Sequence, residues 1–312
     1  MGTVYECRRD GSQARLAIKI ISSGKYASDD ERRRFMAEIA ALLRLRHPHL
    51  CRLRDFGQDG SVSWFVMDFI DGRPFHVWMA EEKPPWIRIA DLLAQASRAV
   101  AHAHRQGIIH RDLNPANIMV LKDGSPVIMD FGLARDLSSD EVLTMSGSTV
   151  GTPPYMSPEQ TLGTKGVVTP CSDVWGMGGV LYHALTGRPP FEGASTHEIF
   201  TAINETEVVR PSHHAKDLPR DLERIALRCL QRDPADRYQD LDALASDLER
   251  VAAGRTVRVR LPGVIGRIHR RARRHPLPWT LGAALILVGL GFLGYAAAEE
   301  IRRWATWTVV VD

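Results

Sequence analysis

Two short apolar runs, each ending in a cluster of polar residues, constrain this chain more than any other feature. The first is residues 109–120, IHRDLNPANIMV, and the second is residues 127–133, VIMDFGL. Apolar runs of this length, rich in Ile, Val and Met, predict short buried strands. Charged residues at the loop ends of such strands are seldom structural padding, so these two loops are the candidate functional site.

His110-Arg111-Asp112, Asn117 and Asp130-Phe131-Gly132 together resemble the catalytic loop and the metal-binding loop of the eukaryotic-type protein kinases. Phosphoryl transfer needs a carboxylate near the attacking hydroxyl, oxygen ligands for Mg²⁺ and a fixed in-line geometry. The resemblance implies that Asp112 is the base, and that Asn117 and Asp130 hold the metal. Ordinary loop carboxylates are the alternative, but two motifs at this spacing favour the kinase interpretation.

The bulk composition is that of a globular protein, and its charge is unevenly distributed. The net charge of the 312 residues is +3, but residues 255–275 contain eight arginines and no acidic residue, and residues 299–312 carry two arginines against three acidic residues. Residues 1–254 therefore have a net charge of −4. This excludes a general nucleic-acid-binding surface. The four cysteines form no CxxC pair, as expected for small buried residues in a reducing compartment.

The N-terminal residues alternate like a β-hairpin that turns at Asp10-Gly11. In the kinase family, fifteen residues separate a valine of the glycine-rich loop from the lysine of the third strand, and here Val4 and Lys19 have this spacing. Gly2 then resembles the last glycine of the loop that covers the ATP phosphates. Because the first strand and two earlier glycines are missing, we expect Met1 to be a misassigned start or a truncation.

Residues 28–46 predict a helix whose apolar stripe includes Ile39 and Leu42. Glu38 lies on the same face, and a carboxylate on a packed face needs a cation. The family resemblance supplies Lys19, which would pair with Glu38 and orient the α and β phosphates. A solvated glutamate at the edge of the stripe is the alternative.

Two strands are expected around residues 50–55 and 63–69, with a turn at 57–60. The resemblance makes Met67 the gatekeeper of an adenine pocket whose edge is read by the backbone of Asp68 and Ile70. It also implies that the adenine ring lies between Val4, Ala17 and Met119. From Gly72 onward the pattern is helical, with a long helix over 87–105.

Asn114 departs from the family pattern, because serine/threonine kinases usually have lysine two residues after the catalytic Asp. An amide can still donate a hydrogen bond to the phosphate or to the substrate hydroxyl, but it brings no charge, and charged contacts are stronger. We therefore list Asn114 among the catalytic residues and expect a weakened rate or weakened nucleotide handling.

Residues 130–159 have little periodicity and match the activation segment of kinases. Arg111 directly precedes Asp112, which is typical of kinases whose segment is ordered by an added phosphate. A polar loop that is never phosphorylated is the alternative. Thr152 favours Ser/Thr over Tyr substrates. The candidate phosphorylation sites are Thr144, Ser146, Ser148 and Thr149.

The resemblance continues past the activation segment to about residue 253. Glu159 is expected to form a buried ion pair with Arg237, and Asp173 is expected to cap the backbone of the catalytic loop. Ser157 stands where alanine is usual.

The composition then changes. Residues 277–298 carry no charge and are long enough, at about 33 Å as a helix, to cross a bilayer core of about 30 Å. A buried core helix is the alternative. The basic segment 254–276 places the preceding domain in the cytoplasm by the positive-inside rule. Residues 299–312 are too few for a sensor domain, so an external signal would need a partner, unless the chain is cut short there as well.

The sequence thus predicts an α+β, bilobal protein kinase-like fold over residues 1–253. Its N-lobe (1–70) lacks the first strand, its C-lobe (71–253) is helical, and a C-terminal transmembrane helix follows. The expected activity is transfer of phosphate from ATP, with Mg²⁺ or Mn²⁺, to Ser or Thr of proteins, with activation-loop autophosphorylation that a homodimer would favour. The expected location is the inner (cytoplasmic) membrane, as a single-pass protein.

Two other functions compete with this interpretation. The first is a catalytically weak pseudokinase-like membrane scaffold, suggested by Asn114 and the missing strand. The second is a small-molecule phosphotransferase, which residues 151–159 disfavour because such enzymes lack this segment.

Overall fold

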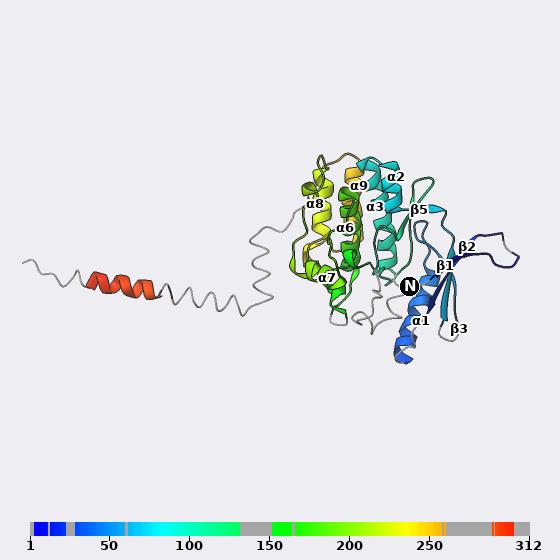
Figure 1. Ribbon diagram of the computed structural model, residues 1–312, viewed down its shortest axis with the longest axis horizontal. Coiled ribbons are helices and arrows are strands. Elements are labelled where there is room, and N and C mark those ends of the chain that lie inside the picture. The colour runs from blue at the N-terminus through cyan, green and yellow to red at the C-terminus, as the bar shows by residue number, and fades with distance from the viewer. Residues whose placement is uncertain are drawn as a thin grey trace, which may run out of the picture. The chain divides into compact units, whose positions relative to one another are not determined.

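The computed structural model describes residues 3–11, 13–22, 29–59, 62–131, 152–163, 166–257, 259, 289 and 291–302. The chain divides into two compact units, Met1–Leu261 and Pro262–Asp312. The first unit contains the candidate site. It joins a strand-rich part to a larger helical part, as the bilobal prediction requires (Figure 1).

The strand-rich part is an antiparallel sheet with the order β1-β2-β4-β3. It consists of β1 (Thr3–Cys7), β2 (Leu16–Ser22), β3 (Leu53–Asp59) and β4 (Val62–Asp68). β1 and β2 form the predicted hairpin, and Gly11 at its turn has φ +76°, a conformation that glycine adopts readily. Helix α1 (Asp29–Arg44) follows and buries Ile39 and Leu42, as its stripe predicted.

The turn predicted at residues 57–60 is wrong at its start. β3 continues through Gly57, which pairs with Trp64 of β4. A Cβ atom at residue 57 would lie 1.9 Å from the Trp64 ring. Gly57 is therefore needed to make room for this indole and not to turn the chain.

The helical pattern expected from Gly72 also begins later than predicted. Residues Gly72–Pro74 form β5, which joins β6 (Ile118–Leu121) and β7 (Pro126–Ile128) in a second sheet of order β5-β6-β7. A Cβ at Gly72 would lie 2.7 Å from the Val120 carbonyl oxygen, so glycine allows the close approach of these strands. Helix α2 (Phe75–Glu82) starts directly after Pro74.

The helical part contains the predicted long helix as α3 (Trp86–His104). It packs along α9 (Leu241–Ala252), and α6 (Pro170–Thr186) packs against α8 (Arg220–Cys229). The remaining short elements are η1 (Pro153–Tyr155), α5 (Pro158–Thr161), α7 (Thr196–Glu205), η3 (Pro211–His213) and η4 (Pro234–Asp236). One apolar cluster extends from Ala17 and Met67 of the first sheet through α3 to Leu248 of α9, so the two parts share a core.

The chain just after α9 is also part of the packed first unit. Val257 is 4% exposed and belongs to the core, and its N–H donates to Asp221 Oδ2 of α8 at 3.2 Å. The chain after α9 therefore folds back against α8 before the second unit begins.

In the second unit, residues 291–302 are helical, so this helix continues past the predicted end at residue 298. Most of the predicted span, residues 277–288 and 290, lies outside the described residues. No helix in the described part of the chain combines the length and the apolar character that crossing a membrane requires.

Candidate active site

The catalytic loop, residues 109–117, connects α3 to β6 and is fixed to the metal-binding loop through His110. This histidine is fully buried, and its Nε2 lies 2.7 Å from the Met129 carbonyl oxygen. Its ring also packs on Phe131, with 4.7 Å between ring centroids. Met129 N–H donates to the Asn117 carbonyl at 2.8 Å. The two predicted loops are therefore held as one unit.

Asp173 of α6 caps the backbone of the catalytic loop, as predicted. Its carboxylate is 1% exposed and accepts hydrogen bonds from the N–H groups of His110 (2.7 Å) and Arg111 (2.8 Å). The His104 Nε2 lies 2.7 Å from the same carboxylate. These contacts hold Arg111 at φ +65°, a conformation that non-glycine residues rarely adopt.

Asp112 and Asn117 lie side by side in the loop. The Asn117 Nδ2 donates to the Asp112 carbonyl oxygen at 2.8 Å and to its carboxylate at 3.0 Å. This leaves the Asn117 Oδ1 as the amide atom that can reach a cation. Together with the Asp130 carboxylate it offers the hard oxygen donors that Mg²⁺ prefers, with the remaining positions left to substrate phosphates and water.

The predicted pairing of Lys19 with Glu38 is wrong for this structure. Lys19 Nζ lies 2.8 Å from Asp130 Oδ2, and Glu38 Oε1 lies 3.5 Å from Arg111 Nη1. All four side chains are partly exposed. Lys19 therefore neutralises the Asp130 carboxylate, which a bound metal would otherwise do. Glu38 pairs with Arg111 of the catalytic loop and not with Lys19 of β2.

Asn114 is buried, with 2% exposure, and its side chain is engaged within the protein. Its Nδ2 donates to the Asp112 carbonyl (3.1 Å) and to Thr152 Oγ1 (3.2 Å). Its Oδ1 accepts from the N–H groups of Ala116 (2.9 Å) and Asn117 (3.3 Å). The contacts that the sequence analysis expected, to phosphate and to substrate hydroxyl, are thus replaced by contacts that shape the loop.

Strand register places four of the predicted nucleotide-binding residues on one face of the first sheet. Val4 is opposite Lys19, and Ala17 is opposite Met67. Residues directly opposite one another in antiparallel strands share a face, as do residues two apart in one strand. Val4 is exposed, whereas Ala17 and Met67 are buried.

The remaining predicted nucleotide contacts lie beyond this face. Met119 of β6 is partly buried, and Asp68 and Ile70 lie at and after the end of β4. Asp68 N–H donates to the Arg52 carbonyl at 3.1 Å.

Several predicted residues lie outside the described residues. These are Gly2, Gly132, Thr144, Ser146, Ser148 and Thr149. Thr152 is described, and its hydroxyl accepts from Asn114, as given above.

The predicted Glu159–Arg237 ion pair is confirmed, and it fixes the end of the activation segment. The guanidinium of Arg237 donates to both Glu159 oxygens, at 2.7 and 2.9 Å, and Ser172 Oγ donates to one of them at 2.7 Å. Burial alone would raise the pKa of Glu159, but the hydrogen bonds and charge of Arg237, with Ser172, hold it below its ordinary value of 4.5.

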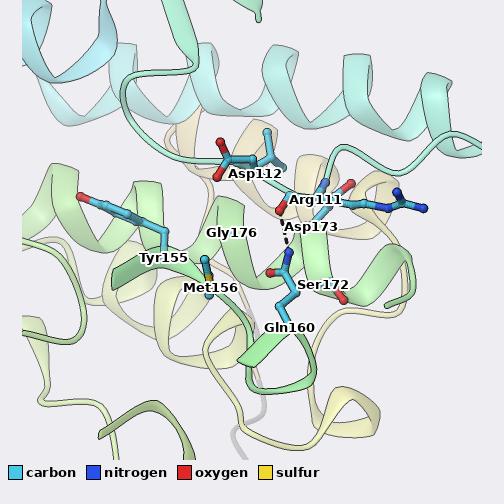
Figure 2. Close-up of a pocket in the computed structure, with 9 residues that line it drawn as sticks. Arg111, Asp112, Tyr155, Met156, Gln160, Ser172, Asp173 and Gly176 are labelled. Atoms are coloured by element: carbon cyan, nitrogen blue, oxygen red, sulfur yellow. Dashed lines mark hydrogen bonds between the residues drawn. The ribbon is translucent and has the colours of Figure 1, made fainter. Parts of the chain in front are cut away.

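Figure 2 shows a small recess beneath the catalytic loop, where Asp112 and Arg111 meet the end of the activation segment. Gln160 lines this recess, and its Nε2 donates to the Arg111 carbonyl oxygen at 2.6 Å. Sequence reasoning missed both Gln160 and His104. In the sequence, Gln160 is marked only by its position directly after Glu159. His104 is marked only as a polar residue at the edge of the apolar stripe of α3.

Residues 1–248 match the protein kinase domain family. Over 268 residues, the chain is 37% identical to the serine/threonine-protein kinase PkaA of Streptomyces coelicolor, covering 81% of this chain and 48% of that protein. It is 32% identical over 251 residues to the serine/threonine-protein kinase PrkC of Bacillus subtilis, covering 80% of this chain and 38% of that protein. The chain therefore spans less than half the length of these relatives.

The crystal structure of the Mycobacterium tuberculosis PknI kinase domain is similar in fold. It matches with a TM-score of 0.63 and 27% identity, over 80% of this chain and 91% of that one. This chain belongs to the protein kinase domain family, in its bacterial serine/threonine branch.

Proposed function

We propose that this chain transfers the γ-phosphate of ATP to Ser or Thr hydroxyls of proteins. The observation that supports this most directly is that two pairs, Asp112–Asn117 and Lys19–Asp130, involve loops joined by the backbone bond from Met129 N–H to the Asn117 carbonyl. These are the groups that phosphoryl transfer requires, and they come from three separate stretches of the chain. Relatives named as serine/threonine kinases support the same substrate class.

Asp112 acts on the acceptor hydroxyl. One of its oxygens is held by the Asn117 amide, so the other can accept the hydrogen bond of a Ser or Thr hydroxyl and aim that oxygen in line with the phosphate. Lys19 binds the phosphate oxygens after it leaves Asp130. Asp130 and Asn117 would hold Mg²⁺ or Mn²⁺, which would neutralise the phosphate charge.

The proposal includes regulation through the activation segment. The Arg111 guanidinium contacts Glu38, and a phosphate on the segment would compete for it with a stronger, doubly charged acceptor. Autophosphorylation at Thr144, Ser146, Ser148 or Thr149 would then release Glu38. Encounter of two copies is the simplest route to this modification.

Membrane attachment through residues 277–298 is the last part of the proposal. It is supported by the uncharged sequence, by the preceding arginines, and by the exposure of Phe292, Leu293 and Tyr295 in the second unit. The full chain should pellet with membranes and resist alkaline carbonate extraction, whereas a chain ending at residue 261 should be released. Extraction of the full chain by carbonate would overturn this part.

The test of the activity is transfer of labelled phosphate from ATP to a Ser/Thr-containing protein in the presence of Mg²⁺. Asp112→Asn and Asp130→Asn should abolish transfer, and Lys19→Met should reduce it by about a hundredfold or more. A folded chain that binds ATP without any transfer would favour the scaffold function. Transfer that survives all three substitutions would contradict the assigned roles.

A further inference from the structure

The backbone of Arg111 is held in an unfavourable conformation, so neighbouring groups must stabilise it. A non-glycine residue in the left-handed region costs about 1–3 kcal/mol and persists only where its surroundings impose it. Asp173 holds the N–H of this residue, as described above. On the other side of the residue, Gln160 holds the carbonyl through a 2.6 Å hydrogen bond, which Figure 2 shows as a dashed line.

The side chain of Gln160 is fixed at both ends of its amide. While Nε2 donates to Arg111, Oε1 accepts from the N–H of Ser157 (3.0 Å) and from its hydroxyl (3.1 Å). A flipped amide would place oxygen against the Arg111 oxygen and nitrogen against the Ser157 N–H, so only one orientation satisfies both partners. Glu159, the residue before Gln160, is anchored by Arg237, which keeps α5 in place.

Holding the Arg111 carbonyl also orients Asp112. The carbonyl of residue 111 and the N–H of residue 112 belong to one planar peptide group, so they rotate together. The Asp112 N–H points toward the His110 Nδ1 at 3.3 Å. A rotation of this peptide would change the direction of the Asp112 side chain, whose carboxylate must meet the acceptor hydroxyl.

We propose that Gln160 is a positioning residue for phosphoryl transfer, because it holds the Arg111–Asp112 peptide in the orientation that aims the Asp112 carboxylate. This inference rests on the proposed kinase function. It makes α5, at the end of the activation segment, a direct support of the catalytic loop. A displacement of α5 by about 1 Å would then change the orientation of the Asp112 carboxylate without any change in the residues that hold ATP.

Three substitutions separate this role from simple capping of α5. Gln160→Glu keeps an acceptor for Ser157 but cannot donate to Arg111, and Gln160→Met removes both contacts without adding charge. Ser157→Ala is the matched control. It removes the hydroxyl contact to the Gln160 side chain and the hydroxyl's part in the capping box of α5, and it leaves the Ser157 N–H contact and the bond to Arg111 in place, so it controls for the loss of capping alone.

The first measurement is steady-state phosphate transfer by the full chain. Both Gln160 variants should lower kcat by about tenfold to a hundredfold, while KM for ATP changes by less than about twofold. For Ser157→Ala, kcat and KM for ATP should both stay within about twofold of the parent values. Parent-like kcat in the two Gln160 variants, or an equal loss in Ser157→Ala, would overturn the proposal.

The second measurement does not need activity. Hydrogen exchange of the amides of residues 110–113 should become faster in both Gln160 variants and stay unchanged in Ser157→Ala, with the global unfolding transition of all variants compared in urea. If the parent transfers no phosphate, the kinase proposal fails and the exchange result still decides whether Gln160 holds this peptide. Unchanged exchange in the Gln160 variants would remove that support.

Discussion

Asn114 illustrates how one side chain sets the geometry of a catalytic loop. Where related kinases have a lysine that can reach substrate, this chain has an amide that is buried and makes four hydrogen bonds within the protein. Two of these bonds hold the N–H groups of Ala116 and of Asn117, the residue proposed to bind the metal. Compared with lysine, Asn114 brings no positive charge to the substrate phosphate, but its hydrogen bonds fix the turn at residues 114–117.

We predict that Asn114→Ala raises the Mg²⁺ concentration needed for half-maximal transfer by about tenfold. The Ala116 N–H loses its bond to the Asn114 side chain, and the Asn117 N–H keeps only its bond to the Asn114 carbonyl. Each lost hydrogen bond contributes about 0.5–1.5 kcal/mol. Initial rates measured against Mg²⁺ concentration at saturating ATP would show it. Asn204→Ala is the control, since this amide bonds to Thr161 and Phe200 and lies on α7. An unchanged Mg²⁺ dependence in Asn114→Ala would contradict the positioning role.

At the scale of elements, the sequence pattern predicts those helices and strands whose bounds depend on neighbouring residues in the chain. The 19-residue helix α3 agrees with its expected bounds within one residue at each end, because a long amphipathic repeat defines both its face and its length. The turn predicted at Gly57 and the helix predicted from Gly72 are wrong. Each glycine is needed because a residue on another strand, Trp64 or Val120, lies too close for a side chain, and no local pattern reveals this contact.

The candidate site shows the same division. The resemblance of its motifs to the kinase family predicted the buried Glu159–Arg237 pair and the Asp173 cap, which the structure contains, and the roles of Asp112, Asn117 and Asp130 stay predictions. The partner of Glu38 could not be predicted, because it depends on where α1 lies relative to the sheet and the catalytic loop. Gln160 acts through a backbone carbonyl 49 residues away, and carbonyl groups leave no sequence signal.

Breaking the buried Glu159–Arg237 ion pair, which anchors α5, should destabilise the fold more than breaking the exposed Arg98–Glu249 pair. Removing one partner of a buried pair costs about 3–5 kcal/mol, so Glu159→Gln should lower the free energy of unfolding by this amount in urea titrations at pH 7. Glu249→Gln, which breaks the exposed pair with Arg98, should cost less than about 1 kcal/mol. Similar losses in the two variants would show that the Glu159 pair is not a buried anchor.

The same pair has a defined pH dependence. Because folding lowers the pKa of Glu159, its contribution is fully present above its ordinary value of 4.5 and is lost as pH falls through the lower, folded-state value. The stability difference between the parent and Glu159→Gln should therefore shrink as the pH of the urea titrations falls below 4.5. A difference that grows on acidification would contradict the direction of the pKa shift.

At the scale of the whole kinase unit, we predict that the ion pairs of Lys19 and Glu38 change when nucleotide binds. Here Lys19 is paired with Asp130 and Glu38 with Arg111. Under the proposed function, Mg²⁺ with ATP would neutralise the Asp130 carboxylate in place of Lys19, and Lys19 would then be available to Glu38. Binding should thus be accompanied by an exchange of partners between α1, β2 and the catalytic loop.

A double-mutant cycle with Lys19→Met and Glu38→Gln tests this exchange. The two substitutions should be additive within about 0.5 kcal/mol in the unfolding free energy without nucleotide, since the residues are not paired there. They should be non-additive by about 1 kcal/mol in the binding of a non-hydrolysable ATP analogue with Mg²⁺. Coupling in the first measurement and not in the second would reverse the assignment of the two states.

The extent of the first unit can be tested at Val257. Val257 is in the core, so the folded unit includes the chain up to this residue and not only to the end of α9. Val257→Ala removes two buried methyl groups and should lower the unfolding free energy of the full chain by about 1.5 kcal/mol. Val209→Ala, at a residue that is 46% exposed, should change it by less than about 0.5 kcal/mol. If both valines behaved alike in urea titrations, the unit would end near residue 253.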